Sequence, residues 1–196
     1  ILTLKNSPVL NKYNFIFNNN KLTLTQNNNE ILTINSNETG EYELLSNKIL
    51  QLENSLQKPI FLMKNNDVPF FDTSISNKTV LTHSISFINN KSIEDFKNKT
   101  NQTIETQRFR GNIYADGIEA WEERNWIGKI IKINNISFKV EKNIPRCVAI
   151  NLKPNSDDNS LNLLQSLKKT YNHFDMGIYL TALDDGLINI GDNILL

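Results

Sequence analysis

The stretch Lys129-Ile-Ile-Lys-Ile-Asn-Asn-Ile-Ser-Phe-Lys-Val140 carries the clearest signal of fold in this chain of 196 residues. Apolar and polar residues alternate in its two arms, 129–133 and 136–140, with the two-residue period of a β-strand. The pair Asn134-Asn135 between the arms tolerates the backbone conformation of a tight turn. We therefore expect a β-hairpin here.

Short strands of the same kind recur on both sides of this hairpin. Residues 14–17, 21–25 and 30–34 alternate in the same way, and asparagine-rich turns at 18–20 and 27–29 separate them. This arrangement predicts a three-stranded meander. Further strands are predicted at 60–63, 109–114, 146–152, 177–182 and 187–196, and an apolar segment around 84–88 begins the second part of the chain.

Three segments favour helices. Apolar residues spaced by four, three and four positions predict a helix over 45–56, which Pro59 would end. The run Ser92-Ile-Glu-Asp95 has the form of a capping box and predicts a short helix from Ser92 to about Lys99. A third helix is expected over 160–169.

Strands therefore dominate the predicted elements, and no alternation of strand, helix and strand is evident. This pattern favours a mostly-β (α+β) fold, a β-barrel with peripheral helices, over a doubly wound sheet. The sequence contains neither a Walker loop nor a Gly-x-Gly-x-x-Gly fingerprint. The polar, turn-rich segment 67–79 is the expected junction between two domains.

Composition excludes several classes of function. Lys and Arg number 21 and so do Asp and Glu, and this zero net charge argues against a general nucleic-acid surface. No apolar run reaches the length of a membrane span. The single cysteine cannot form an internal disulfide and fits a reducing, cytoplasmic compartment. It also excludes a self-contained iron–sulfur cluster and a cysteine-rich zinc site.

Arginine is confined to one part of the chain, whereas lysine is spread widely. All four arginines lie between positions 108 and 146, and Cys147 follows the last of them. The planar arginine fork suits phosphate and carboxylate, so the window indicates a site for an anionic cofactor or substrate. Ordinary salt bridging is the alternative, because Glu119, Glu122 and Glu123 lie in the same window.

Several motifs in this part of the chain resemble those of MOSC domains, the C-terminal domains of molybdenum cofactor sulfurases and their relatives. Arg108-Phe-Arg-Gly-Asn-Ile-Tyr-Ala-Asp-Gly117 is similar to the family's "RFRPN-I-hydrophobic-DG" signature, with Gly111 in place of the usual proline. Pro145-Arg-Cys-Val148 resembles its "(P/S)-R-C" motif. The run Glu122-Glu-Arg-Asn-Trp126 and the terminus from Gly186 to Leu196 are similar to two further family motifs.

The resemblance implies a domain organisation as well. Residues 67–196 would form the MOSC domain, and residues 1–66 would be a truncated form of its β-rich N-terminal companion domain, the beginning of which is expected to lie outside this sequence. Within the family, the motifs look closest to amidoxime-reducing components and bacterial reductases of N-hydroxylated bases.

The resemblance also implies roles for individual residues toward a molybdopterin-type molybdenum cofactor. Cys147 would be the catalytic residue and would ligate molybdenum as a thiolate, a soft ligand suited to this metal. Arg110, Asn112, Arg146 and Ser84 match or lie near positions that hold the pterin or its phosphate. In a strand over 109–114, Arg110 and Asn112 would share one face. Arg146 beside Cys147 would favour the thiolate.

The implied activity is two-electron reduction of a small N-hydroxylated substrate. Because this chain cannot build an iron–sulfur cluster, a separate ferredoxin- or cytochrome-type protein would supply the electrons. The alternative is a non-catalytic carrier of cofactor or sulfur, in which Cys147 would hold a persulfide.

A Cys–His hydrolase is a further alternative, with His83 or His173 as the base and Asp175 orienting it. Two tryptophans, Trp121 and Trp126, either stack on a substrate ring or pack in the core.

Overall fold

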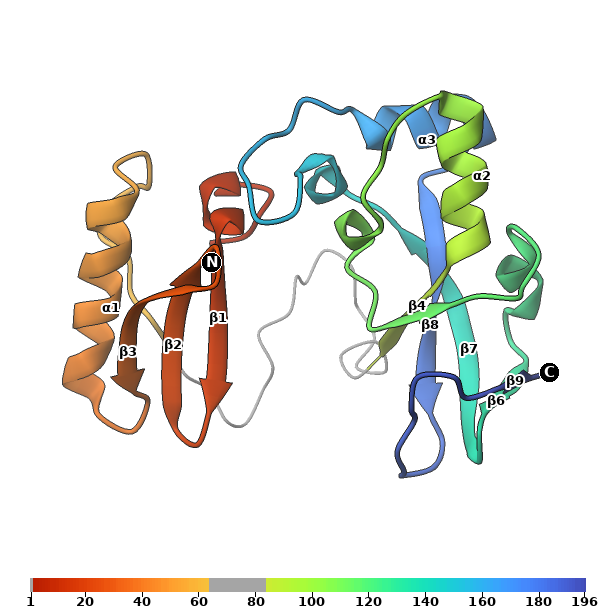
Figure 1. Ribbon diagram of the computed structural model, residues 1–196, viewed down its shortest axis with the longest axis horizontal. Coiled ribbons are helices and arrows are strands. Elements are labelled where there is room, and N and C mark those ends of the chain that lie inside the picture. Colours follow the sequence, from red (N-terminus) through yellow and green to blue (C-terminus); the bar gives the residue numbers. More distant parts are fainter. Residues whose placement is uncertain (1, 64–83) are drawn as a thin grey trace. The chain divides into compact units, whose positions relative to one another are not determined.

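The structure is a computed structural model that describes residues 2–63 and 84–196. The chain divides into two compact units (Figure 1). Of the described residues, unit 1 contains 2–63 together with 151–161, and unit 2 contains 84–150 together with 162–196. The chain therefore returns to unit 1 after much of unit 2 has been formed. The predicted junction at 67–79 lies outside the described residues.

Unit 1 contains the predicted meander. Strands β1 (Tyr13–Asn18), β2 (Lys21–Gln26) and β3 (Asn29–Asn35) pair antiparallel in the order β1-β2-β3, after a 3-10 turn η1 (Pro8–Lys12). Asparagines occupy both hairpin turns with positive φ, which asparagine tolerates better than most residues. The three predicted strands and their turns are confirmed.

Helix α1 (Thr39–Leu52) covers this small sheet. It begins six residues before the predicted start, and Leu56 reaches the buried core from beyond its end. The strand predicted at 60–63 is wrong. Leu62 N–H donates to the Ser46 hydroxyl of α1 (3.2 Å), so this backbone group is satisfied by a helix side chain and not by a neighbouring strand.

Unit 2 is built on a curled six-stranded sheet, a half-barrel, in the order β5-β4-β8-β7-β6-β9. All neighbouring pairs are antiparallel except β4 (Ile85–Asn89) and β5 (Ile113–Ala115), which are parallel and are joined through helix α2 (Asn90–Thr100). The expectation of no strand–helix–strand unit is therefore wrong for this one connection. The predicted fold class, strand-rich α+β with peripheral helices, is confirmed.

The hairpin predicted at 129–140 is present as β6 (Ile130–Ile133) and β7 (Ile136–Pro145). Ile133 pairs with Ile136 across the turn, and Asn134 has a φ of 55°. The alternate residues of the two arms are buried in one apolar core with Trp126. Trp126 is thus a core residue.

Helices α2 and α3 (Leu163–Tyr171) lie side by side at one end of the sheet (Figure 1). The N-cap of α2 is Asn89, whose side chain accepts a hydrogen bond from Lys91 N–H. The capping role predicted for Ser92 is therefore wrong, because its hydroxyl donates to the buried carboxylate of Glu123. The third predicted helix is confirmed, with Asn162 as its N-cap.

Three predicted strands of unit 2 differ from the structure. Residues 109–114 contain the end of a 3-10 turn, η3 (Thr106–Phe109), and only the start of β5. Residues 146–152 contain a 3-10 turn, η5 (Val148–Asn151), and the final strand β9 is limited to Ile194–Leu195. The strand predicted at 177–182 is confirmed as β8 (Asp175–Ala182). Among the described residues, the helices are too short and too polar to cross a membrane.

Candidate functional site

The segment that carries Arg146 and Cys147 begins where β7 ends. Pro145 pairs with Asp175 of β8, and Arg146 N–H donates to the Phe174 carbonyl (2.9 Å). Cys147 follows between β7 and η5, with a half-exposed, unoxidised thiol. The site is therefore at the end of a sheet ladder, where regular pairing stops and side chains can face a ligand.

The Arg146 guanidinium is bound to backbone carbonyls. Nε donates to the Met176 carbonyl (2.8 Å) and Nη2 contacts the same oxygen, while Nη1 donates to the Phe109 carbonyl (2.8 Å). These bonds tie the end of β7 to both β8 and η3. A guanidinium has five N–H groups, so two are left for another acceptor.

Arg146 is a partly buried cation. Burial lowers its pKa to about 10, while Tyr179 and Tyr114 act in the opposite direction and Cys147 and Asp175 do so less strongly. Within residues 2–63 and 84–196, Arg146 forms no ion pair with an Asp or Glu. A buried charge without a paired charge is unfavourable, so an anion bound at this position would be stabilised.

Arg110 and Arg146 connect the two motif segments, 108–117 and 145–148, in both directions. Arg110 Nη1 donates to the Ala149 carbonyl (3.1 Å), two residues after Cys147, whereas Arg146 donates to Phe109, one residue before Arg110. Partial burial lowers the pKa of Arg110, and the nearby Cys147 raises it. The structure thus brings Arg110, Arg146 and Cys147 into one cluster.

The remaining two predicted site residues lie near β4. Asn112 Oδ1 accepts from both the backbone N–H (2.9 Å) and the hydroxyl (2.7 Å) of Ser86, so Asn112 is fixed to that strand. Ser86 was missed by the sequence reasoning, which pointed to Ser84. Ser84 is half-buried just before β4. The two serines are separated by one residue, and the loose motif match there gave no signal to choose between them.

Arg110 and Asn112 do not share a strand face as predicted. Arg110 has a φ of 47° and follows η3, and only from Ile113 does the chain enter β5. Their proximity comes instead from Ser86, whose hydroxyl also contacts the Arg110 carbonyl (3.4 Å). The prediction that alternation along a strand places both side chains on one face is therefore wrong.

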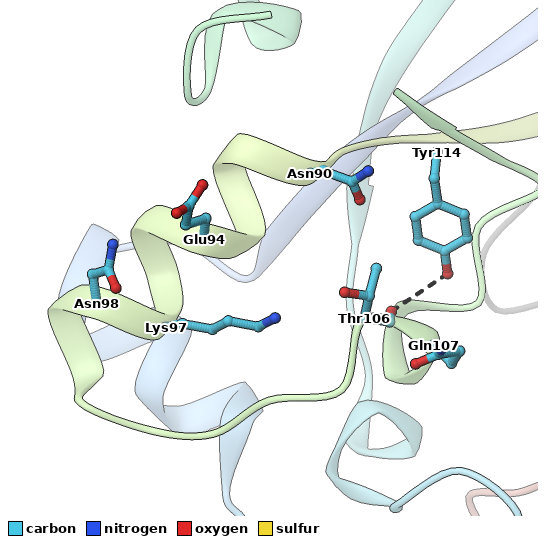
Figure 2. A pocket seen from close by; sticks show the side chains of 7 residues that line it. All are labelled: Asn90, Glu94, Lys97, Asn98, Thr106, Gln107 and Tyr114. Carbon is cyan, nitrogen blue, oxygen red and sulfur yellow. Dashed lines mark hydrogen bonds between the residues drawn. The ribbon is translucent and has the colours of Figure 1, made fainter. Parts of the chain in front are cut away.

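Tyr114 lies next to the turn that contains Arg110 and Gly111. It also lines a polar pocket between α2 and η3. Its hydroxyl accepts from Gly111 N–H (2.8 Å) and donates to the Thr106 carbonyl (3.4 Å), the dashed contact in Figure 2. The pocket has a volume of about 610 Å³. Its other lining residues are Asn90, Glu94, Lys97, Asn98, Thr106 and Gln107.

The other two arginines are paired with carboxylates, as the salt-bridge alternative expected, although not with the predicted glutamates. Arg108 binds Glu105 (2.6 Å) and Arg124 binds Asp175 (3.1 Å). The ion-pair interpretation therefore accounts for half of the arginine window. The guanidinium groups of Arg110 and Arg146 both donate to backbone carbonyls of the two segments around Cys147, those of Ala149 and Phe109.

His173 is packed in an aromatic cluster and does not form the hydrolase arrangement with Asp175. Its ring stacks on Tyr171 at 5.8 Å, and Nδ1 accepts from the Asp175 backbone N–H (3.1 Å), while the Asp175 carboxylate is used by Arg124. Trp121 contacts both rings of this cluster. His83 lies outside the described residues.

Among the described residues, no cluster of three or more His, Cys, Asp or Glu side chains is arranged to hold a metal ion. The chemistry available at the site is that of one accessible thiol, two guanidinium groups and an amide. Such a donor set suits a soft metal that arrives with an anionic organic ligand.

Fold and site together define a strand-rich α+β protein with a thiol and two arginines where strand β7 of a curled sheet ends. A family profile for the MOSC domain matches residues 58–195, well over half of the sequence. The chain therefore belongs to the MOSC domain family. Among solved structures, YiiM from Geobacillus stearothermophilus is similar, with 15% sequence identity and a TM-score of 0.45. The match covers 57% of this chain and 52%, about half, of that protein. No curated protein matches the sequence.

Proposed function

We propose that this chain binds a molybdopterin-type molybdenum cofactor and reduces small N-hydroxylated substrates. The observation that carries the proposal is the partly buried Arg146 cation, without an acidic partner in the described residues, beside the partly exposed thiol of Cys147. Membership of the MOSC family, which is linked to this cofactor in general, supports it. Under the same proposal, 67–196 is the MOSC domain and 1–66 is its companion domain.

The residues present fit such a group. Cys147 would supply a thiolate to the metal, and the two remaining N–H groups of Arg146 would neutralise adjacent negative charge. Arg110 and the Asn112 amide would hold the pterin or its phosphate from the opposite segment, and Ser86 would orient Asn112. When bound, the cofactor supplies the two-electron redox chemistry, and the protein supplies ligation, charge and orientation.

The overall reaction is balanced by an external donor. The substrate N–O bond breaks, two electrons and two protons are taken up, and the amine form of the base and one water are released. The electrons come from a separate ferredoxin- or cytochrome-type protein.

The first test is the molybdenum content of the chain produced in a cofactor-competent host. We expect near-stoichiometric metal in the wild type and almost none in Cys147→Ser. Arg124→Gln is the matched control, since it removes an arginine of the same window that is already paired with Asp175, and it should keep its metal. A folded wild type without molybdenum would contradict the proposal.

The second test separates a reductase from a carrier of cofactor or sulfur. Dithionite-reduced, metal-loaded protein is mixed with an excess of an N-hydroxylated amidine, and product is measured in a single turnover. About one amidine per molybdenum supports reductase chemistry. Metal binding without product, accompanied by a persulfide on Cys147, would establish the carrier.

A further inference from the structure

We propose that Tyr114 is a positioning residue that fixes Arg110 and Asn112 for ligand binding by clamping the turn before them with its hydroxyl group. This inference rests on the proposed function, because it concerns how this chain prepares those two cofactor contacts. Tyr114 itself is not placed against the ligand.

The turn between η3 and β5 needs such a clamp because its backbone is strained. Arg110 has a φ of 47°, the left-handed region, which costs a residue with a Cβ about 1–2 kcal/mol. A residue is held in this region only when its surroundings over-determine the conformation. Contacts that fix the neighbouring peptide groups therefore also fix the position and direction of the Arg110 Cα–Cβ bond.

Gly111 cannot provide this rigidity by itself. It has no side chain, and a Cβ at this position would lie 2.5 Å from Cγ1 of the buried Ile88 and 3.1 Å from the Tyr114 ring. Packing therefore excludes larger residues here, and the position keeps a flexible backbone. Fixing the turn must come from hydrogen bonds to its peptide groups.

The Tyr114 hydroxyl makes those bonds on both sides of the turn. It accepts from Gly111 N–H (2.8 Å) and donates to the Thr106 carbonyl (3.4 Å) at the start of η3. One oxygen atom thus joins the first residue of the 3-10 turn to the residue that follows Arg110 (Figure 2 shows the contact with Thr106). The hydroxyl closes the loop from 106 to 111.

The C-terminal end of the same loop contains the two proposed ligand contacts, Arg110 and Asn112. The Arg110 guanidinium reaches the Ala149 carbonyl beside Cys147, and Asn112 is bound to Ser86. Without the Tyr114 hydroxyl, Gly111 N–H loses its acceptor, and the turn keeps fewer bonds, among them those from Arg146 to the Phe109 carbonyl and from Ser86 to the Arg110 carbonyl. The guanidinium would then sample more positions, which weakens binding without removing any contact group.

The test uses Tyr114→Phe, which keeps the ring and removes only the hydroxyl. The matched control is Tyr42→Phe in unit 1, another half-buried tyrosine whose hydroxyl donates to a backbone carbonyl, that of Ser36. Hydrogen exchange at the Gly111 amide is measured by NMR on full chains that also carry Cys147→Ser, so that no cofactor is bound. Molybdenum per chain is measured separately with Cys147 intact.

We expect about tenfold faster exchange at Gly111 in Tyr114→Phe, since loss of a net hydrogen bond of about 1–1.5 kcal/mol corresponds to this factor. Tyr42→Phe should leave Gly111 unchanged. Molybdenum retained after dialysis should fall several-fold in Tyr114→Phe and should be normal in the control, with similar melting temperatures for the two variants.

Unchanged exchange at Gly111 would overturn the clamp. Faster exchange with full molybdenum retention would overturn its role in positioning. If the wild type carries no molybdenum, the proposed function fails and the positioning role fails with it, while the exchange experiment still shows separately whether Tyr114 holds the turn.

Discussion

Replacing Gly177 by alanine offers a quantitative test of how tightly the site is packed. Gly177 lies in β8 between Met176, which accepts from Arg146, and Ile178, which pairs with Phe87 of β4. Its φ is 80°, and a Cβ there would lie 2.4 Å from the Phe87 carbonyl oxygen and 2.6 Å from Ile88 Cδ1. The nearest atom belongs to the backbone, so the two strands must separate to admit a methyl group.

Two separate terms set the magnitude. An alanine at this φ costs about 1–2 kcal/mol, and overpacking a close-packed core costs about 1–3 kcal/mol. We therefore expect the free energy of unfolding of unit 2 to fall by about 2–5 kcal/mol. Separation of β4 from β8 would also disturb the Met176 carbonyl, so molybdenum retention should fall as well.

Gly117→Ala is the control that separates these terms. Gly117 has nearly the same φ, 77°, but a Cβ there meets no atom within 4 Å. Unfolding in urea is followed by tryptophan fluorescence, which reports on unit 2 because both tryptophans, Trp121 and Trp126, lie in it. If Gly177→Ala lowers stability no more than Gly117→Ala does, the reasoning about close approach of β4 and β8 is refuted.

Three further predictions concern polar side chains of unit 2. Burial raises the pKa of Glu123, despite hydrogen bonds from Asn89 and Ser92. The folded state therefore binds its proton more tightly than the unfolded state, and this group's contribution to stability rises as pH falls from neutral toward the ordinary glutamate range. Urea titrations at several pH values should show that Glu123→Gln removes this rise, and an unchanged slope would contradict it. Burial and the Arg124 cation lower the pKa of His173, so stability from this group is lost as pH falls from about 6.5 through the folded pKa. His173→Gln should flatten the pH dependence of the melting temperature in that window, and a slope equal to that of the wild type would count against it. Asp95 Oδ2 accepts from Trp121 Nε1 (2.7 Å), so Asp95→Ala should destabilise unit 2 by about 1–3 kcal/mol and alter tryptophan emission, whereas no change in either would show that the bond contributes little.

Sequence patterns predicted the elements whose geometry depends on local alternation and turn chemistry. The hairpin around Asn134 and the meander of unit 1 are of this kind, because asparagine turns and alternating side chains act within a few residues. The strand expected at 109–114 is wrong because η3 ends at Phe109 and Arg110 has a positive φ. The Arg110 carbonyl contacts Ser86 of β4, 24 residues earlier, and the local pattern does not contain such a contact.

In the candidate site, too, local sequence patterns predicted some features, whereas others depend on contacts between residues distant in the sequence. The motifs identified which residues to examine, but they did not show that Arg146 is held by the Met176 and Phe109 carbonyls. The spacing of Ser92 to Asp95 fits the capping-box motif and so predicts a helix cap. The actual partner of Ser92, Glu123, is 31 residues away, and no local rule connects the two. The cofactor and substrate roles stay predictions.

Translation of this chain imposes an order on its assembly. Residues 151–161 belong to unit 1, where Asn11 Nδ2 donates to the carbonyls of Lys153 (2.7 Å) and Ser156 (2.6 Å). They leave the ribosome only after Cys147 has been made. Unit 1 therefore receives these contacts, made by Asn11 of η1, only after most of the curled sheet has been synthesised. A nascent chain that stops at residue 150 would leave both units incomplete.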